Sequence, residues 1–411
     1  MIFNGLTREQ NMLLSLVAKN FNSQSFVMPK NNLQNLDWEE IAKESVYQSV
    51  SLLAFESASD YKNDIPREIY EKWKNVVIKT IRLNQTVNNA EKELAELMDK
   101  NSYPFIILKG SASAFYYDNS ELRTFGDVDF LIEKKDKDCL EKLFTENGYV
   151  MSQGDHPNHV VFKKPGANLE MHFEVAGIPY GEKGEKIRKF LEGAIISRQI
   201  QKVNEINLPF PSPVNHAIIL LLHSQHHLLG EGLGLRHLLD LAYFVDKTKD
   251  EDFWINELIP FLKEIGLLVF TKALVCTACK AFDLVIPKWA KDVDEKLTEE
   301  VLEDVFRGGN FGRKDKNRSS SGMLISEHGK GGTKHGAIYN LAHSLHLAVI
   351  RQYPIVKKVW IFYPFIYIYK ALRFLFLSLI GKRPSLVKMA PEAKKRKKIY
   401  DKLHVFQTEE K

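Results

Sequence analysis

The sequence is poor in cysteine, with three among 411 residues. So few thiols exclude the disulfide-rich secreted class and are typical of a protein kept in a reducing cytoplasm. Cys276 and Cys279 have the spacing of a redox or metal motif. They lie in the apolar run KALVCTACKAF, however, and we interpret them as buried residues of a helix. The N-terminal MIFNGLTREQ has no basic stretch ahead of an apolar one, so we expect no signal peptide.

A large excess of basic charge is also missing. Lys and Arg number 57 against 52 Asp and Glu, a formal charge of +5. Residues 382–411 carry +6 of it, which leaves −1 for residues 1–381. Proteins that bind nucleic acid without sequence preference usually have a basic stripe on the folded body, so nucleic acid is not favoured as a partner.

The chain has no long uncharged hydrophobic run. The most apolar stretch, VWIFYPFIYIYKALRFLFLSLI at 359–380, is interrupted by Pro364, Lys370 and Arg373. Three interpretations stay open: a helix docked on the protein, a helix lying on a membrane surface, or a membrane span. We expect a cytoplasmic protein, with peripheral contact to the inner membrane surface through 359–398 as an option, because basic residues follow the apolar stretch.

Changes in the periodicity of hydrophobic residues divide the sequence into four parts. Residues 1–100 have helical periodicity, and residues 101–205 alternate short strands with one helix. Helical periodicity returns in 206–340, which includes the Gly-rich basic loop 306–336, and 341–411 holds the apolar helix and the basic tail. The sequence therefore predicts an α+β protein: a small mixed β-sheet core with helices, flanked by N-terminal and C-terminal helical regions.

Acidic residues stand out in the predicted core. Side chains alternate along a strand, so GDVDFLI places Asp127 and Asp129 on one face, and NLEMHFEV places Glu170 on the polar face of a later strand. If the two strands are neighbours, three carboxylates converge. Clustered carboxylates repel one another unless a cation neutralises them, and oxygen ligands at this density suit Mg²⁺ shared with substrate phosphates.

A candidate phosphate site precedes this acidic pair. The strand PFIILKG ends at Gly110, and Ser111 begins a helix-like segment, a turn that can present backbone N–H groups and a hydroxyl to an anion. A phosphate held there and a metal on the carboxylates would describe a nucleoside triphosphate bound for in-line phosphoryl transfer.

These motifs resemble the uncharacterised bacterial nucleotidyltransferase family of the DNA polymerase β-like nucleotidyltransferase superfamily. The similar segments are LKGSASAFYY, LRTFGDVDFLI and LEMHFEV, in that order. The resemblance implies an enzyme, a Mg²⁺-dependent (or Mn²⁺-dependent) transferase. It would move a nucleoside monophosphate from ATP or another nucleoside triphosphate to a hydroxyl or amine acceptor and release pyrophosphate. The acceptor stays open among a small molecule, a peptide or protein, and an RNA end.

The resemblance also assigns roles to residues. It implies that Asp127, Asp129 and Glu170 are the catalytic metal ligands and that Gly110 and Ser111 hold the triphosphate. Two basic positions, Lys109 and Arg123, match the motif and would neutralise phosphate charge, although salt bridges with nearby acids are nearly as strong an alternative. The family's histidine corresponds to His172, a second-tier site residue without an assigned role.

The helical region offers further candidates. His223 and His227 lie four residues apart, a metal-ligand spacing, but the Glu that a zincin requires is absent; cleft-lining and half-buried histidines are the alternatives. Arg236 is a second-tier candidate for substrate contact, and its spacing from Asp240 also fits a structural ion pair.

Two other functions compete with nucleotidyl transfer. One is kinase-like transfer of the γ-phosphoryl group on the same fold, which would yield a nucleoside diphosphate. The other is a catalytically silent scaffold that binds nucleotide or membrane.

Overall fold

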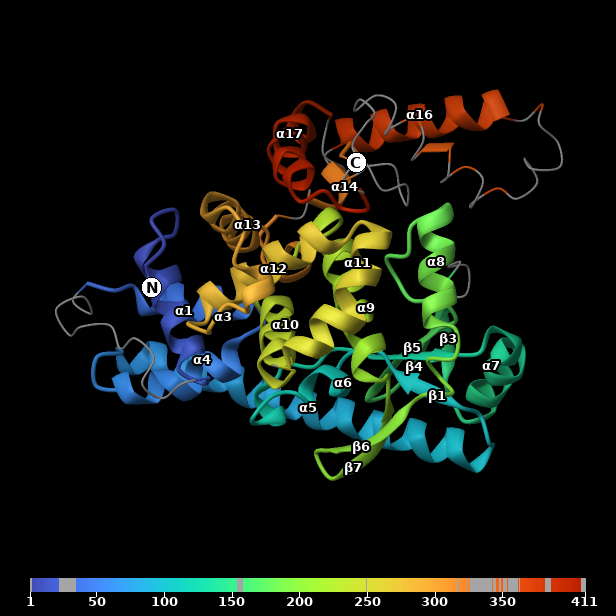
Figure 1. Cartoon of the computed structure of the whole chain (residues 1–411), viewed down its shortest axis with the longest axis horizontal. Helices are drawn as coiled ribbons and strands as arrows, with labels where there is room; N and C mark the ends of the chain where they lie inside the picture. Colours follow the sequence, from blue (N-terminus) through green and yellow to red (C-terminus); the bar gives the residue numbers. More distant parts are fainter. Residues whose placement is uncertain are drawn as a thin grey trace.

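The computed structural model describes residues 2–21, 35–153, 158–248 and 250–315, and in the C-terminal part 318–322, 324–325, 361, 363–380 and 386–407, with a few single residues between. It confirms the α+β class. A five-stranded mixed sheet is flanked by helices, and most of the chain is helical (Figure 1).

The N-terminal region is helical. Its helices are α1 (Arg8–Ala18), α3 (Trp38–Tyr47), α4 (Ser51–Ala58) and α5 (Arg67–Lys100). The 34-residue helix α5 runs beneath the sheet (Figure 1) and joins both parts of the core. Its first half packs with the N-terminal helices through Trp73 and Val77, and its second half packs on the sheet through Leu94 and Met98.

The sheet has the strand order β1-β2-β5-β4-β3. Its strands are β1 (Phe105–Ile107), β2 (Val128–Ile132), β3 (Val150–Gln153), β4 (His159–Lys164) and β5 (Ala167–His172). A hairpin around Pro165-Gly166 joins β4 to β5, and Lys164 pairs with Ala167 across it. Strand β2 is antiparallel to β1 and parallel to β5, so the two strands that carry the predicted carboxylates are neighbours.

The two faces of the sheet differ in what covers them. On one face, Phe130 and Met171 join a cluster with α5 and with α7 (Lys137–Glu146). On the other face, Ile106 and Leu131 belong to the larger cluster that includes the C-terminal helices. Asp129 alternates with Phe130, so it faces the C-terminal helices rather than α5. The short helix α6 (Ser111–Ala114) follows β1 on this side.

The helical region after the sheet begins later than the sequence indicated. The expected boundary at residues 205 and 206 falls inside a hairpin of β6 (Gln199–Val203) and β7 (Ile206–Phe210). Asn204 and Glu205 form its turn, both with positive φ. Pro209 lies near the end of β7, where an edge strand accommodates a proline. The helices around and after this hairpin are α8 (Glu182–Leu191), α9 (Pro213–Leu229), α10 (Leu235–Lys247), α11 (Ile259–Ile265), α12 (Leu268–Ala281) and α13 (Glu295–Gly308).

Part of the segment 306–336 is ordered as structure rather than loop. Helix α13 extends to Gly308, and α14 (Arg318–Gly322) lies within the segment. Arg318 is fully buried and pairs with Asp304, and Arg396 donates to the Leu228 carbonyl at 2.9 Å. Residues 326–336 lie outside the described part. Arg396 belongs to α17 (Leu386–Lys402), so the basic tail packs against the body through one of its own arginines.

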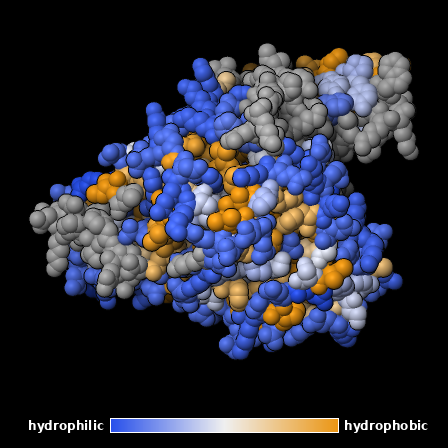
Figure 2. All heavy atoms as spheres, viewed as in Figure 1, coloured by the Kyte–Doolittle hydropathy of each residue, from blue (hydrophilic) through white to orange (hydrophobic). Residues whose placement is uncertain are grey.

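Helix α16 (Tyr363–Leu379) lies at the periphery (Figure 1). Its exposed apolar residues recur every three or four positions: Phe365, Ile368, Tyr369, Leu372, Phe376 and Leu379. Hydrophobic atoms of this helix are visible at the surface in Figure 2. Among the described residues, no helix combines the length and the apolar character needed to cross a bilayer.

Candidate active site

The predicted carboxylates lie together on the face of the sheet that is opposite α5, the same face as Ile106 and Leu131. Asp129 on β2 lies directly opposite Glu170 on β5 in the parallel register, and Asp127 immediately precedes β2. Asp129 is 4% exposed, whereas Glu170 is half-buried and Asp127 is exposed at the edge. The alternation of strand side chains and the adjacency of β2 and β5 together produce the acidic cluster that the sequence predicted.

Two cationic or protonatable side chains hold the buried carboxylate. The Lys109 Nζ lies 2.7 Å from Asp129 Oδ1, and the His172 Nε2 lies 2.9 Å from the same oxygen. The same His172 nitrogen is 3.4 Å from Glu170 Oε2. Lys109 directly follows Leu108, whose amide donates to the Asp129 carbonyl, so the end of β1 positions the lysine at the cluster.

The carboxylates titrate differently because their surroundings differ. Burial alone would raise the pKa of Asp129, but Lys109 and His172 hold it below its ordinary value. The neighbouring charge of Asp129, helped by desolvation, raises the pKa of Asp127 to about 7. The hydrogen bond with His172 lowers the pKa of Glu170, and the two carboxylates raise the pKa of His172 against its burial. The like charge of Asp129 is thus the main obstacle to the ionisation of Asp127.

The donor set fits a hard divalent cation. Ligand atoms of Asp129, Glu170 and His172 all lie within 4.8 Å of one another, and Asp127 adds a carboxylate whose raised pKa reflects crowding by like charge. Carboxylate oxygens are what Mg²⁺ and Mn²⁺ prefer. Glu174, two residues beyond His172, instead forms an ion pair with Arg188.

The Gly110-Ser111 turn is held by a hydrogen bond to Glu91, a buried acid that the sequence analysis did not single out. The Ser111 hydroxyl donates to Glu91 Oε2 at 2.5 Å, and Glu91 on α5 is 1% exposed. Gly110 has φ +60°, and a Cβ there would sit 3.4 Å from Glu91 Oε1, so glycine suits the turn. A signal was present in the sequence: Glu91 lies on the same helix face as Val87, Leu94 and Met98, which face the core.

Arg123 belongs to a buried network. Its Nε and Nη2 donate to the two carboxylate oxygens of Asp240 at 2.8 Å each, and the Tyr117 hydroxyl donates to Asp240 Oδ1 at 2.8 Å. Arg123 is 4% exposed. The structural pair expected between Arg236 and Asp240 is therefore replaced by one between Arg123 and Asp240, which ties the segment before β2 to α10.

Arg236 lies beside the same segment, and in the described part of the chain it forms no ion pair with a carboxylate. Its Nη1 donates to the Thr124 carbonyl at 3.3 Å, and its guanidinium lies 5.2 Å from the centre of the Phe311 ring. Burial and the charge of Arg123 lower the pKa of Arg236 to about 10, against the opposing charges of Asp240 and Asp127. Arg236 thus faces the loop that carries the acidic pair.

The histidines of α9 gather with one from α10. Ring nitrogens of His223, His227 and His237 lie within 4.8 Å of one another. Burial, reinforced by nearby positive charge, lowers the pKa of all three, so they are neutral at physiological pH. Lys109 is among the charges that depress the pKa of His223, which places this cluster next to the acidic edge.

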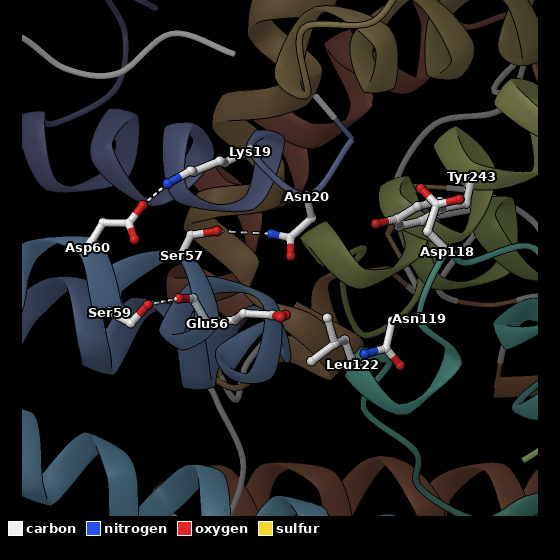
Figure 3. A pocket seen from close by; sticks show the side chains of 10 residues that line it. All are labelled: Lys19, Asn20, Glu56, Ser57, Ser59, Asp60, Asp118, Asn119, Leu122 and Tyr243. Atoms are coloured by element: carbon white, nitrogen blue, oxygen red, sulfur yellow. Dashed lines mark hydrogen bonds and ion pairs between the residues drawn. The ribbon is translucent and has the colours of Figure 1, made fainter. Parts of the chain in front are cut away.

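A separate surface cavity of about 430 Å³ lies between the N-terminal helices and α10 (Figure 3). Its lining includes Glu56, Asp118 and Tyr243, and none of the predicted site residues. Lys19 and Asp60 pair with each other across its wall, and Lys247 pairs with Asp118. Asp60 and Asp118 are thus each paired with a lysine, unlike the carboxylates that share the acidic edge.

A comparison with protein families identifies the class of this chain as a transferase. The chain belongs to a nucleotidyltransferase family: the model of the family described as uncharacterised nucleotidyltransferase matches residues 34–283, more than half of the sequence. The matched segment contains the carboxylates, the Gly110-Ser111 turn and the histidines of α9 and α10. A comparison with curated proteins gives no match.

Proposed function

We propose that this protein is a Mg²⁺-dependent (or Mn²⁺-dependent) nucleotidyltransferase of the DNA polymerase β-like type. It transfers a nucleoside monophosphate from a nucleoside triphosphate to a hydroxyl or amine acceptor. The observation that carries the proposal is the direct pairing of Asp129 with Glu170 on adjacent parallel strands, with Asp127 two residues before Asp129. Membership of the nucleotidyltransferase family supports it.

Each residue of the edge has a role in this proposal. Asp127, Asp129 and Glu170 would hold the metal, which, when bound, offsets the negative charge of the triphosphate in the transition state. Glu170 is more accessible than Asp129, the acid opposite it on β2, and its lowered pKa keeps it ionised. In this proposal Glu170 accepts the proton of the attacking acceptor group. The new bond joins the acceptor atom to the α-phosphorus, the bond from that phosphorus to the β-phosphate oxygen breaks, and pyrophosphate leaves.

The phosphates would lie against the turn after β1. The Lys109 ammonium group, which forms an ion pair with Asp129, supplies positive charge to the triphosphate. Gly110 allows close approach of the backbone, and Ser111 shapes the turn through its bond to Glu91. Arg123 acts through Asp240 in this proposal, by holding the segment that carries Asp127, because its buried guanidinium is engaged by that carboxylate.

The test is label transfer from each α-³²P nucleoside triphosphate to acceptors in a cell extract with Mg²⁺. We expect transfer by the native protein and none by the double variant Asp127→Ala/Asp129→Ala. Asp138→Ala, which removes an exposed acid on α7, is the matched control and should transfer normally. Equal transfer by the double variant, or no transfer by the native protein, would contradict the proposal. Transfer of γ-³²P with formation of a nucleoside diphosphate would indicate the kinase-like alternative.

For the C-terminal part, we propose that the exposed face of α16 contacts an anionic membrane surface in the cytoplasm. Two features support this: the apolar side chains recur every three or four residues, and the neighbouring helix α17 exposes Lys394, Lys395 and Lys398. Apolar residues would enter the interface while the lysines meet anionic headgroups.

A further inference from the structure

We propose that Arg236 and His237 form an oxyanion site next to the acidic edge, which takes a phosphate group of a substrate. This inference rests on the proposed nucleotidyl transfer, because it assigns a second recognition element to the same centre. The ligand is defined by its chemistry, a phosphate or similar oxygen-rich anion. It would belong either to the triphosphate or to the acceptor.

The first argument is an uncompensated cation. The partner that the local spacing offered to Arg236 is Asp240, but both oxygens of that carboxylate are engaged by Arg123. The Arg236 Nε is buried and has no hydrogen-bond partner in the described part of the chain, and its Nη1 donates to a neutral carbonyl 3.3 Å away. Arg236 is half-buried as a residue, but a buried guanidinium nitrogen is normally paired, so its Nε is available to an anion that enters with a ligand.

The second argument is the tautomer of His237. The Gly234 amide donates to His237 Nδ1 at 3.2 Å, so that nitrogen carries a lone pair. A neutral imidazole then bears its proton on Nε2. This Nε2 is buried without a hydrogen-bond partner among the described residues, and the residue is 4% exposed. His237 therefore presents an unused N–H donor, and its ring and the Arg236 guanidinium both lie against the Phe311 ring.

The third argument is a strained residue that holds the cluster together. Phe311 adopts φ +55°, a conformation that an aromatic residue rarely takes without a compensating constraint. Its ring lies 5.2 Å from the Arg236 guanidinium, 4.7 Å from the His227 ring and 5.6 Å from the His237 ring. Phe311 is 38% exposed, so the cluster has one side next to solvent.

The position of the cluster fits a substrate group. Arg236 contacts Thr124, three residues before Asp127, and the charge of Asp127 acts on it. The positive charge of Lys109 contributes to the lowered pKa of His223, which lies next to His227 and His237. A phosphate held by Arg236 and His237 would thus lie at the side of the acidic edge that faces α10.

A transition metal on the three histidines is the competing interpretation, since their nitrogens lie within 4.8 Å of one another. Two observations disfavour it. Ligation by His237 Nε2 requires a lone pair on the nitrogen that carries the proton. A divalent cation would also be placed beside Arg236 and Lys109, whose charges already depress the pKa of the histidines. Both features favour an anion.

The test is a calorimetric titration of the full chain with inorganic phosphate. We expect millimolar binding that weakens about tenfold or more in Arg236→Gln, because a hydrogen bond to a charged group is lost, and by a smaller factor in His237→Phe. Arg236→Lys keeps the charge and should retain most of the binding. Arg67→Gln, which removes an exposed arginine at the start of α5, is the matched control and should bind as the native protein does.

A second titration in saturating Mg²⁺ and α,β-methylene-ATP assigns the source of the phosphate. Loss of phosphate binding, together with weaker nucleotide binding by Arg236→Gln, supports the site and assigns it to the triphosphate. Retained phosphate binding with unchanged nucleotide affinity supports it and assigns it to the acceptor. The inference is overturned if the native protein does not bind phosphate. It is also overturned if Arg236→Gln and His237→Phe bind phosphate as tightly as the native protein does. One bound Zn²⁺ per chain that is lost in His237→Phe overturns it as well.

Failure of this inference can be told apart from failure of the proposed function. The variant Asp127→Ala/Asp129→Ala should lose label transfer but still bind phosphate, because Arg236 and His237 are intact. Conversely, normal transfer by Arg236→Gln with unchanged phosphate binding would reject the oxyanion site and leave the acidic edge unaffected.

Discussion

Glu91 gives the protein a dependence of stability on pH that a single substitution should remove. Its carboxyl is 1% exposed beneath the Gly110-Ser111 turn, and burial raises its pKa to about 7 from the ordinary 4.5, even though Ser111 and Arg123 lower it. An acid with a raised pKa binds its proton more tightly in the folded protein than in the unfolded chain. The stabilisation is therefore complete below about pH 4.5 and is lost as the pH rises through about 7.

The magnitude follows from the shift. A change of one pKa unit corresponds to about 1.4 kcal/mol, so the shift from 4.5 to about 7 corresponds to about 3 kcal/mol. Between pH 5 and pH 8 we expect the contribution of Glu91 to the free energy of unfolding to fall by about 2–3 kcal/mol. Glu91→Gln has no titrating group at this site, so the difference between native and variant free energies should change by that amount over the same range.

The assay is urea unfolding of both proteins at pH 5, 6, 7 and 8. Glu96→Gln, on an exposed position of the same helix, should follow the native protein throughout. Other groups with raised pKa values, Asp127 among them, are present in all three proteins and cancel in the difference. Curves for native protein and Glu91→Gln that run parallel across the whole range would refute the reasoning, because Glu91 would then be ionised in the folded protein at every pH.

Three further predictions concern the network, the metal and the membrane. Asp240→Asn should lower the free energy of unfolding by about 3–5 kcal/mol in urea, because it leaves the Arg123 guanidinium buried without its counter-charge; a loss below about 1 kcal/mol would contradict this. Binding of Mg²⁺, measured by calorimetry, should tighten as the pH rises from 6 toward the Asp127 pKa of about 7, because that carboxyl must release its proton, and Asp127→Asn should lack this dependence. Leu372→Asp/Phe376→Asp should reduce sedimentation with phosphatidylserine vesicles, and undiminished binding would exclude α16 as the contact.

Much of the acidic edge could be predicted from local pattern. Strand alternation places Asp127 and Asp129 on one face whatever the rest of the fold is, and the Pro165-Gly166 turn already fixes the partner of the Glu170 strand as β4. What alternation does not specify is which strands pair across a long separation. The parallel pairing of Asp129 with Glu170 depends on how the intervening helix α7 and strands pack, so the convergence of the carboxylates was conditional until the sheet order was known.

The hairpin at 199–210 shows where local signals mislead. Pro209, Pro211 and Pro213 are typical of a boundary between structural regions, and the sequence predicts that a helical region begins near them. Proline is compatible with a strand at a sheet edge, however, and the positive φ of Asn204 and Glu205 provides the turn. The choice between a boundary and an edge strand is made by long-range packing, since β7 also lies against β1 and α5.

The sequence by itself determined the α+β class, the shared face of Asp127 and Asp129, and the glycine turn, because each depends on neighbours a few residues away. The tertiary structure alone decided which charges are paired. Spacing offered Asp240 to Arg236, four residues earlier on the same helix, yet the fold delivers Arg123 from more than a hundred residues away in a two-point contact. A bidentate pair in a buried site is stronger than a pair along a helix surface. That substitution of partners is what leaves Arg236 without an anion beside the acidic edge.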